Sequence, residues 1–94
     1  MEKSKNRSDT LRLEQVEFIP ERLEQGVIYY SEKYRTATHL CACGCGHKVV
    51  TPIKTGQWSL TILHGTATLS PSIGNFQIPC KSHYYIYEGK VIWV

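Results

Sequence analysis

The sequence of 94 residues has no long hydrophobic run and no long stretch with helical periodicity. No segment approaches the about 18 apolar residues that a membrane-spanning helix needs, and the N-terminus lacks the hydrophobic core of a signal peptide. We therefore expect a cytoplasmic protein without a membrane segment. Disulfides are rare in that reducing compartment, so clustered cysteines there more often bind a metal or carry out redox chemistry.

Acidic residues are scarce in most of the chain, because Glu88 is the only one after Glu32. A metal-dependent hydrolase usually places a carboxylate or a histidine close to the reacting water, so this scarcity favours a binding protein over an enzyme. The net charge of +3 is mild and includes no block of consecutive basic residues. Nucleic acid is therefore not an expected partner.

Short strand patterns separated by turn residues fill most of the chain, which predicts a small all-β sandwich or barrel of about seven strands with no long helix. The polar residues 1–14 are expected to form a disordered N-terminal arm, and residues 15–94 a single zinc-binding β domain. Residues 70–75, SPSIGN, are expected to form a loop, and Trp58, Phe76 and Trp93 to fill the core. Strands are expected at 13–20, 26–31, 36–42, 48–53, 57–63, 66–70, 83–87 and 90–94.

Three of the four cysteines stand at alternate positions in HLCACGCGHKVV, residues 39–50. Structural zinc sites usually take two ligands from each of two tight turns. The second turn would be Cys80-Lys81-Ser82-His83, a C-x-x-H step before the final hairpin. The sequence therefore predicts a metal site of rubredoxin-like or Rieske-like knuckles, formed by thiolates and one imidazole.

The first turn offers more cysteines than a four-ligand site needs. Glycine follows Cys43 and Cys45, and its backbone freedom can turn an amide toward a ligand sulfur, whereas alanine follows Cys41. We therefore favour Cys43 and Cys45 together with Cys80 and His83, and keep Cys41 as a substitute. His39 and His47 are lesser candidates, since a single histidine is more often a surface or core residue than a ligand.

Zinc is the expected metal, at one ion per chain, and a 2Fe–2S cluster is the alternative. A Rieske centre places two histidines on one iron, one from each turn. The first turn here offers C-G-C where a Rieske protein has C-x-H, so the ligand set departs from that pattern and favours zinc.

The blocks HLCACGCG, VVTP, WSLT, LSPSIGN, PCKSHY and GKVIW carry a more specific resemblance. Over residues 16–94 the chain resembles a family of small bacterial proteins defined only as a domain of unknown function. Members are often encoded beside ubiquitin-like modifiers, their activating and conjugating enzymes and JAB-type peptidases. The resemblance implies a part in a bacterial ubiquitin-like pathway. It also marks Cys41, Cys43, Cys45, Cys80 and His83 as metal-type residues.

These observations together predict a zinc-binding adaptor or accessory protein of a bacterial ubiquitin-like conjugation system, with a ubiquitin-like modifier or its conjugating enzymes as partner. Two alternatives stay open: a Rieske-type iron–sulfur electron carrier, and a thiol-dependent transfer factor in which Cys41 accepts the modifier. The sequence assigns no catalytic residue. Alternation in the final hairpin predicts that one pair among Tyr84, Tyr85, Ile86 and Tyr87 is exposed for binding a partner.

Overall fold

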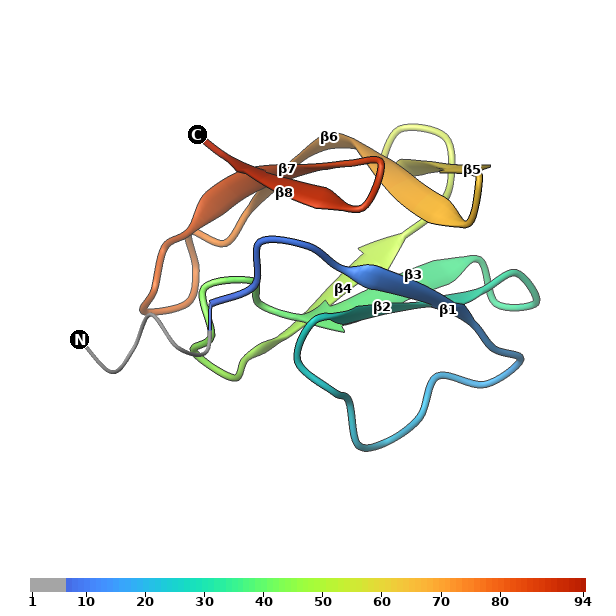
Figure 1. Cartoon of the computed structure of the whole chain (residues 1–94), viewed down its shortest axis with the longest axis horizontal. Coiled ribbons are helices and arrows are strands. Elements are labelled where there is room, and N and C mark those ends of the chain that lie inside the picture. Colours follow the sequence, from blue (N-terminus) through green and yellow to red (C-terminus); the bar gives the residue numbers. More distant parts are fainter. Residues whose placement is uncertain (1–6) are drawn as a thin grey trace.

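The computed structural model describes residues 7–94, which fold into eight strands arranged in two four-stranded sheets (Figure 1). No helix occurs within this range, so the all-β prediction is confirmed. Residues 7–94 accordingly contain no helix that could cross a membrane. The strands are β1 (Arg12–Gln15), β2 (Val27–Ser31), β3 (Thr36–Leu40), β4 (Lys48–Pro52), β5 (Ser59–Leu63), β6 (Thr66–Gly74), β7 (His83–Tyr87) and β8 (Lys90–Trp93).

The first sheet has the order β1-β2-β3-β4, and its central strand β2 is buried on both faces. Ile28 and Tyr30 point into the core between the sheets. Val27 and Tyr29 point to the opposite face. β2 and β3 pair as an antiparallel hairpin around residues 31–35, which confirms the two strands expected at 26–31 and 36–42 as neighbours.

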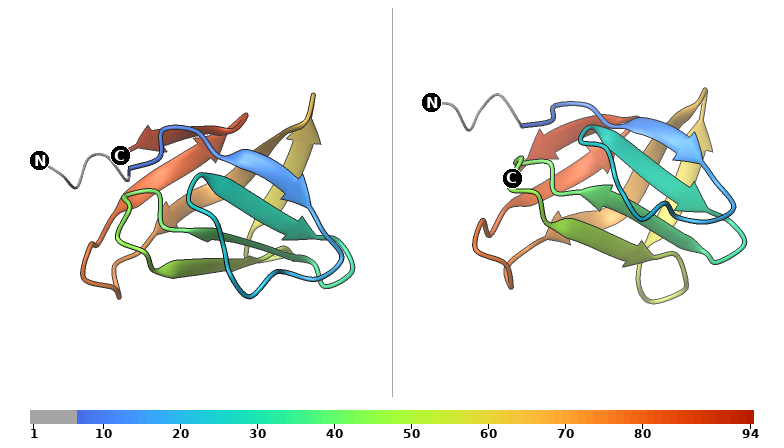
Figure 2. Two further views of the ribbon diagram at one scale, coloured as in Figure 1. Left: turned by 60° about the horizontal axis from the view of Figure 1, so that its bottom comes forward. Right: turned by 90° about the horizontal axis from the view of Figure 1, so that it is seen from below.

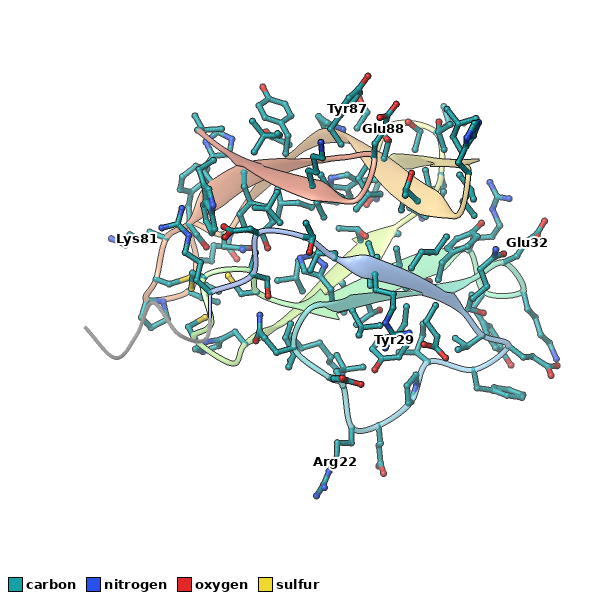
Figure 3. The ribbon with its side chains drawn as sticks, in the orientation of Figure 1. Arg22, Tyr29, Glu32, Lys81, Tyr87 and Glu88 are labelled. Atoms are coloured by element: carbon teal, nitrogen blue, oxygen red, sulfur yellow. The ribbon has the colours of Figure 1, made fainter. Side chains whose placement is uncertain are left out.

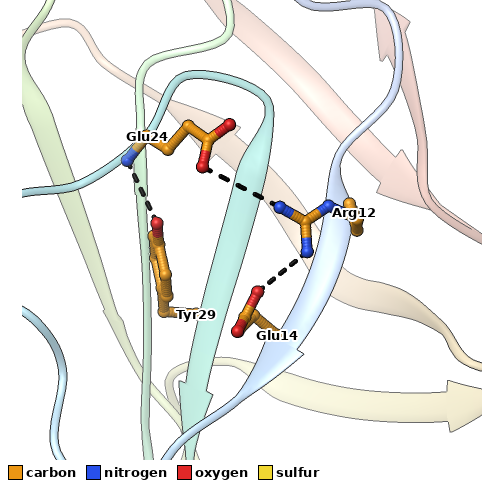
Figure 4. Close-up of polar contacts among 4 residues, drawn as sticks. All are labelled: Arg12, Glu14, Glu24 and Tyr29. Carbon is orange, nitrogen blue, oxygen red and sulfur yellow. Dashed lines mark hydrogen bonds and ion pairs between the residues drawn. The ribbon is translucent and has the colours of Figure 1, made fainter.

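The connection from β1 to β2, residues 16–26, covers the outer face of this sheet. β1 and β2 pair in parallel, and a tight hairpin cannot join two parallel strands. The connection must therefore run back along the sheet to the start of β2. The Glu24 backbone amide donates to the Tyr29 hydroxyl over 3.1 Å, and Arg12 pairs with Glu14 at 2.8 Å and with Glu24 at 3.9 Å (Figure 4). Because this connection covers it, Tyr29 is only 8% exposed although it lies on the outer face of the sheet.

The second sheet has the order β5-β6-β7-β8 and is antiparallel throughout. The predicted turn between its last two strands is confirmed: Glu88 and Gly89 both adopt positive φ, at 48° and 79°. This is the geometry of a two-residue hairpin turn, and it favours glycine. Figure 2 shows the two sheets facing one another as layers of a sandwich.

A buried polar contact joins the two layers inside the core. His39 on β3 and Tyr84 on β7 are both fully buried, and His39 Nε2 lies 2.8 Å from the Tyr84 hydroxyl. The backbone amide of Ala42 donates to the same hydroxyl over 3.2 Å. The Tyr84 hydroxyl therefore links β3 and the turn that follows it to the second sheet.

The structure differs from three details of the sequence interpretation. Residues 1–6 of the predicted arm lie outside the described residues, and from Ser8 the chain packs against the domain: Leu11 is 3% exposed and Arg12 begins β1. The loop predicted over residues 70–75 is wrong for most of its length, since β6 continues to Gly74. Phe76 does not fill the core, since 60% of it is exposed.

Candidate functional site

The four cysteines form one compact cluster at the end of the sandwich. Their Sγ atoms all lie within 4.8 Å of one another. Cys41, Cys43 and Cys45 come from the turn between β3 and β4, and Cys80 comes from the loop between β6 and β7. Figure 3 shows sulfur atoms gathered beside the loop that carries Lys81. The two turns therefore converge as the cysteine spacing predicts.

The spacing of the sulfurs fits one tetrahedral ion. Cys41 Sγ lies 3.5 Å from Cys43 Sγ and 3.7 Å from Cys80 Sγ. Four thiolates at the zinc–sulfur bond length of about 2.3 Å would be separated by roughly 3.8 Å. In a 2Fe–2S cluster, thiolates on opposite irons are held farther apart because two irons lie between them. The cluster could thus hold a metal ion with its existing geometry.

Polar side chains surround the cluster and orient its sulfurs. The Ser82 hydroxyl lies 3.0 Å from Cys41 Sγ and 3.2 Å from Cys80 Sγ, and Asn75 Nδ2 donates to Cys41 Sγ over 3.4 Å. The Asn75 backbone amide donates to the Ser82 carbonyl over 2.8 Å, which closes the loop that carries Cys80. Such groups around a metal site fix the orientation of its ligands.

The environment shifts the pKa values of the thiols in different directions. Burial, reinforced by hydrogen bonds from Cys41 and Cys45, raises the pKa of Cys43 to about 12. At Cys80 burial also favours the thiol, but hydrogen bonds from the Ser82 side chain and backbone outweigh it and lower the pKa to about 7. Of these two residues, Cys80 therefore supplies a thiolate more readily before a cation binds.

His83 lies outside this group of four sulfurs and takes part in a different contact. Its Nε2 atom lies 2.8 Å from the Ser72 Oγ atom. A hydrogen bond joins these two atoms, and its direction depends on the tautomer of His83: the Ser72 hydroxyl donates where Nε2 is unprotonated. A serine hydroxyl that donates to an imidazole nitrogen is the arrangement of a nucleophile with its general base. Within residues 7–94, no carboxylate bonds to this imidazole.

The strand register pairs Gly74 with His83, and Ser72 lies two residues before Gly74 on the same face of β6. Leu69 pairs with Ile86 and Ile73 pairs with Tyr84, so β6 advances four residues while β7 advances two. The two extra residues form a bulge just before Ile73. Bulges commonly redirect a side chain beside a functional site. Alternation between the buried residues Leu69 and Ile73 places Ser72 on the outer face of the sheet, where the His83 side chain also lies.

Two partly exposed aromatic rings flank the imidazole of His83. The Phe76 ring meets it edge-on with centroids 5.3 Å apart, and the Tyr85 ring stacks on it at 6.5 Å. An ideal Cβ on Gly74 would lie 2.6 Å from the Phe76 ring, so only glycine lets Phe76 lie over β6 in this way. The rings limit the imidazole to a position from which it reaches Ser72.

The two lesser histidine candidates have separate environments. His39 is buried against Tyr84, and its desolvation lowers its pKa to about 4, so the ring is neutral at physiological pH. His47 is exposed, and its Nδ1 lies 3.4 Å from Cys45 Sγ. Neither belongs to the compact group of four cysteines.

Sequence analysis did not identify Ser72 as a functional residue. The residue lies in SPSIGN, whose proline and glycine resemble an ordinary turn, and it matches no nucleophile motif. His83 was considered only as a ligand because it stands three residues after Cys80. The alternation of β7 does place His83 on the same face as Tyr85, but the continuation of β6 through Pro71, which puts Ser72 beside β7, leaves no local sequence signal.

Comparison with protein families identifies one match, which covers residues 15–94 and is described as the bacterial ubiquitination-like system serine protease, BubE. Comparison with curated proteins and with solved structures finds no match. The matched segment contains the seven strands β2–β8 and only the last residue of β1, as well as the cysteine cluster and the Ser72–His83 pair. The chain therefore belongs to the BubE family of a bacterial ubiquitination-like system.

Proposed function

We propose that this protein is a serine hydrolase of the peptidase type that acts in a bacterial ubiquitin-like system and carries a structural metal site. The observation that supports the proposal is the 2.8 Å contact between Ser72 Oγ and His83 Nε2. The family description independently names a serine protease. Neither nucleophile nor base comes from the cysteine cluster, so the two centres have separate roles.

In this mechanism the Ser72 oxygen attacks the carbonyl carbon of the substrate while its proton passes to His83 Nε2. The imidazolium formed then donates that proton to the leaving group as the bond between the carbonyl carbon and that group breaks, which leaves the acyl group on Ser72. Water, deprotonated by the same nitrogen, attacks the acyl carbon, and the imidazolium returns its proton to the Ser72 oxygen as the acyl–oxygen bond breaks. This sequence requires an imidazole whose Nε2 is unprotonated at the start, so that it acts first as base and then as acid.

Covalent labelling with an organofluorophosphonate tests this function without knowledge of the substrate. We expect one adduct on Ser72, found by mass spectrometry of peptides. Ser70→Ala is the matched control because Ser70 precedes the same bulge but has no contact with His83, so labelling should persist in that variant and disappear in Ser72→Ala. Labelling of Ser72→Ala at the wild-type rate would show that this serine is not the nucleophile.

The proposed metal is zinc, bound by Cys41, Cys43, Cys45 and Cys80. Sulfur separations of 3.5 and 3.7 Å support a single tetrahedral ion. This set replaces the predicted imidazole with the third thiolate of the first turn. We also propose a cytoplasmic location, where a reducing environment keeps the thiols available. Elemental analysis should find about one zinc per chain, and two irons with acid-labile sulfide would contradict it.

The adaptor role is the second candidate, and the outer face of the second sheet favours it. Tyr85, Tyr87 and Ile92 are 48%, 56% and 46% exposed and lie together on this face, because Tyr85 pairs with Ile92 across β7 and β8. The exposed tyrosine pair expected in the final hairpin is thus identified. Exposed aromatic residues favour protein partners, and the proposed partner is a ubiquitin-like modifier or one of its conjugating enzymes.

A further inference from the structure

A groove beside Ser72 is bordered by backbone edges from both sheets. It has a volume of about 350 Å³ and lies between β4 and the end of β6. The lining side chains that matter here are Lys48, Val50, Trp58, Gly74 and Phe76. Phe76 also contacts His83, so the groove reaches the edge of the candidate catalytic pair.

The first border is the outer edge of β4, which pairs only with β3 in the part of the chain that the structure describes. His47 accepts from the Cys41 amide, and the Ile53 amide donates to Arg35, so odd-numbered residues of β4 bond toward β3. Lys48 and Val50 therefore direct their amide and carbonyl groups outward. In agreement, the carbonyl of Pro52 accepts from Trp58 on the outer side over 3.3 Å.

The second border is the last part of β6. β5 pairs with β6 only as far as Ser70, so no described strand lies along the far edge of residues 71–74. Ile73 pairs with Tyr84, and the Asn75 amide donates to Ser82, which directs these residues toward β7. By alternation, Ser72 and Gly74 direct their backbone groups away from β7 and toward the groove.

The charge around the groove has one sign. Lys48 lines it, and Arg35 and Lys54 line an adjoining groove that shares Trp58 as a wall. Neither lining includes an aspartate or a glutamate. A negatively charged occupant would therefore be attracted along the whole path, and it would meet no opposing carboxylate.

We propose that this groove binds an extended, acidic peptide segment by backbone hydrogen bonds to the edges at Val50 and Gly74, and that the segment is thereby presented to Ser72. Addition of a strand to an exposed edge supplies affinity through the main chain, and flanking side chains supply selectivity. This proposal defines a substrate class for the proposed hydrolase. Its catalytic part rests on the proposed function of Ser72 and His83.

The binding test uses Ser72→Ala, so that turnover cannot remove the probe, and a fluorescent peptide of alternating valine and glutamate. Fluorescence anisotropy should show binding that weakens as salt is added. Two matched peptides test the two parts of the proposal on the same protein. N-methylation of alternate amides removes the donors of β-addition, and lysine in place of glutamate reverses the charge. Each change should weaken binding by about tenfold or more.

Variants of the groove give a second measurement. Lys48→Glu should weaken binding by about tenfold, whereas Lys90→Glu, which makes the same charge change on the far strand β8, should leave it nearly unchanged. Val50→Pro removes an outward amide and should weaken binding without loss of metal. The proposal is overturned if the N-methylated or lysine peptide binds as well as the parent, or if the β4 edge instead pairs two copies of the chain in a dimer that Val50→Pro dissociates.

Failure of this proposal differs from failure of the proposed function. If fluorophosphonate labels Ser72 while the acidic peptide does not bind, the hydrolase stands and the groove proposal is wrong. If the peptide binds as expected while Ser72 stays unlabelled, the groove is a peptide site and the hydrolase proposal is wrong.

Discussion

The cysteine cluster and the Ser72–His83 pair meet at one loop, residues 75–82, but they are built from different kinds of structure. Three of the four thiols come from the turn between β3 and β4 and the fourth comes from this loop, so the cluster joins two segments that lie outside the strands. Ser72 and His83 instead lie on adjacent, paired strands. A metal ion bound to the four thiols would tie those two segments together, whereas the strand ladder already positions the pair.

This difference assigns the two regions different energetic roles. A metal ion bound by four thiolates would stabilise a small core that buries little surface. It would also fix the loop whose two ends carry Phe76 and His83. The pair contributes little to folding, because one exposed-face hydrogen bond is worth about 1 kcal/mol. Loss of the metal should therefore disturb both the cysteine cluster and the Ser72–His83 pair. Loss of the pair should change only the reactivity of Ser72 and leave folding intact.

The largest effect is expected for Cys80→Ser. This change removes the only thiolate that the second turn contributes, and structural zinc can supply about 10 kcal/mol or more of folding free energy in peptides. We expect complete loss of metal, loss of the β-sheet circular dichroism signal and loss of Ser72 labelling. Ser72→Ala is the control and should keep its full metal content and melting temperature. A Cys80→Ser protein that stays folded and labelled would show that the two regions are independent.

The next largest effect is expected for His83→Ala. Removal of a general base typically lowers a rate by about 10²–10⁴-fold, and the rate of Ser72 labelling should fall within this range. Metal content should not change, because His83 Nε2 is bonded to Ser72 rather than to the cluster. Loss of metal in this variant would support the ligand role that the sequence suggests for His83, and it would contradict the four-thiolate site.

A smaller effect is expected for Tyr84→Phe. The Tyr84 hydroxyl connects the core to the turn between β3 and β4, which carries three of the four cysteines. The change removes the hydroxyl that bonds both His39 Nε2 and the Ala42 amide and leaves two buried groups without partners. We expect a loss of about 2–3 kcal/mol in the free energy of unfolding, measured by urea denaturation. Tyr85→Phe is the control, since its hydroxyl is exposed. Equal stability of the two variants would exclude a structural role for the buried network.

The fold was largely predictable because short strands alternate cleanly between buried and exposed residues. In β7, Tyr84 and Ile86 are buried while Tyr85 and Tyr87 are exposed, as alternation requires. The parallel pairing of β1 with β2 was not predictable, because it depends on how residues 16–26 cover Tyr29. The extension of β6 through Pro71 was also missed, since proline and glycine normally mark turns.

The candidate site was predictable only where its residues are close in sequence. C-x-C-x-C followed by Cys80 predicts a thiol-rich site, but the sequence favoured His83 over Cys41 as the fourth ligand, and the structure gathers all four cysteines instead. The Ser72–His83 contact instead depends on a strand register and a bulge, and neither follows from local residue types. The groove between β4 and β6 is even harder to predict from the sequence, because it forms only where the edges of two different sheets come together.

The smallest effect is expected on a surface that belongs neither to the cysteine cluster nor to the Ser72–His83 pair. Tyr87 is exposed on the outward face of the final hairpin (Figure 3), and unlike Tyr85 it has no contact with His83. If this face binds a component of the ubiquitin-like system, Tyr87→Ser should weaken the complex by about 1–2 kcal/mol. Titration calorimetry with the partner recovered by pull-down would measure this change.

Leu63→Ser is the control, because Leu63 is similarly exposed but lies at the far end of β5. Metal content and Ser72 labelling should be unchanged in both variants. Equal weakening by both substitutions would mean that partner binding is not centred on the hairpin, and no weakening by either would exclude this face as the adaptor surface.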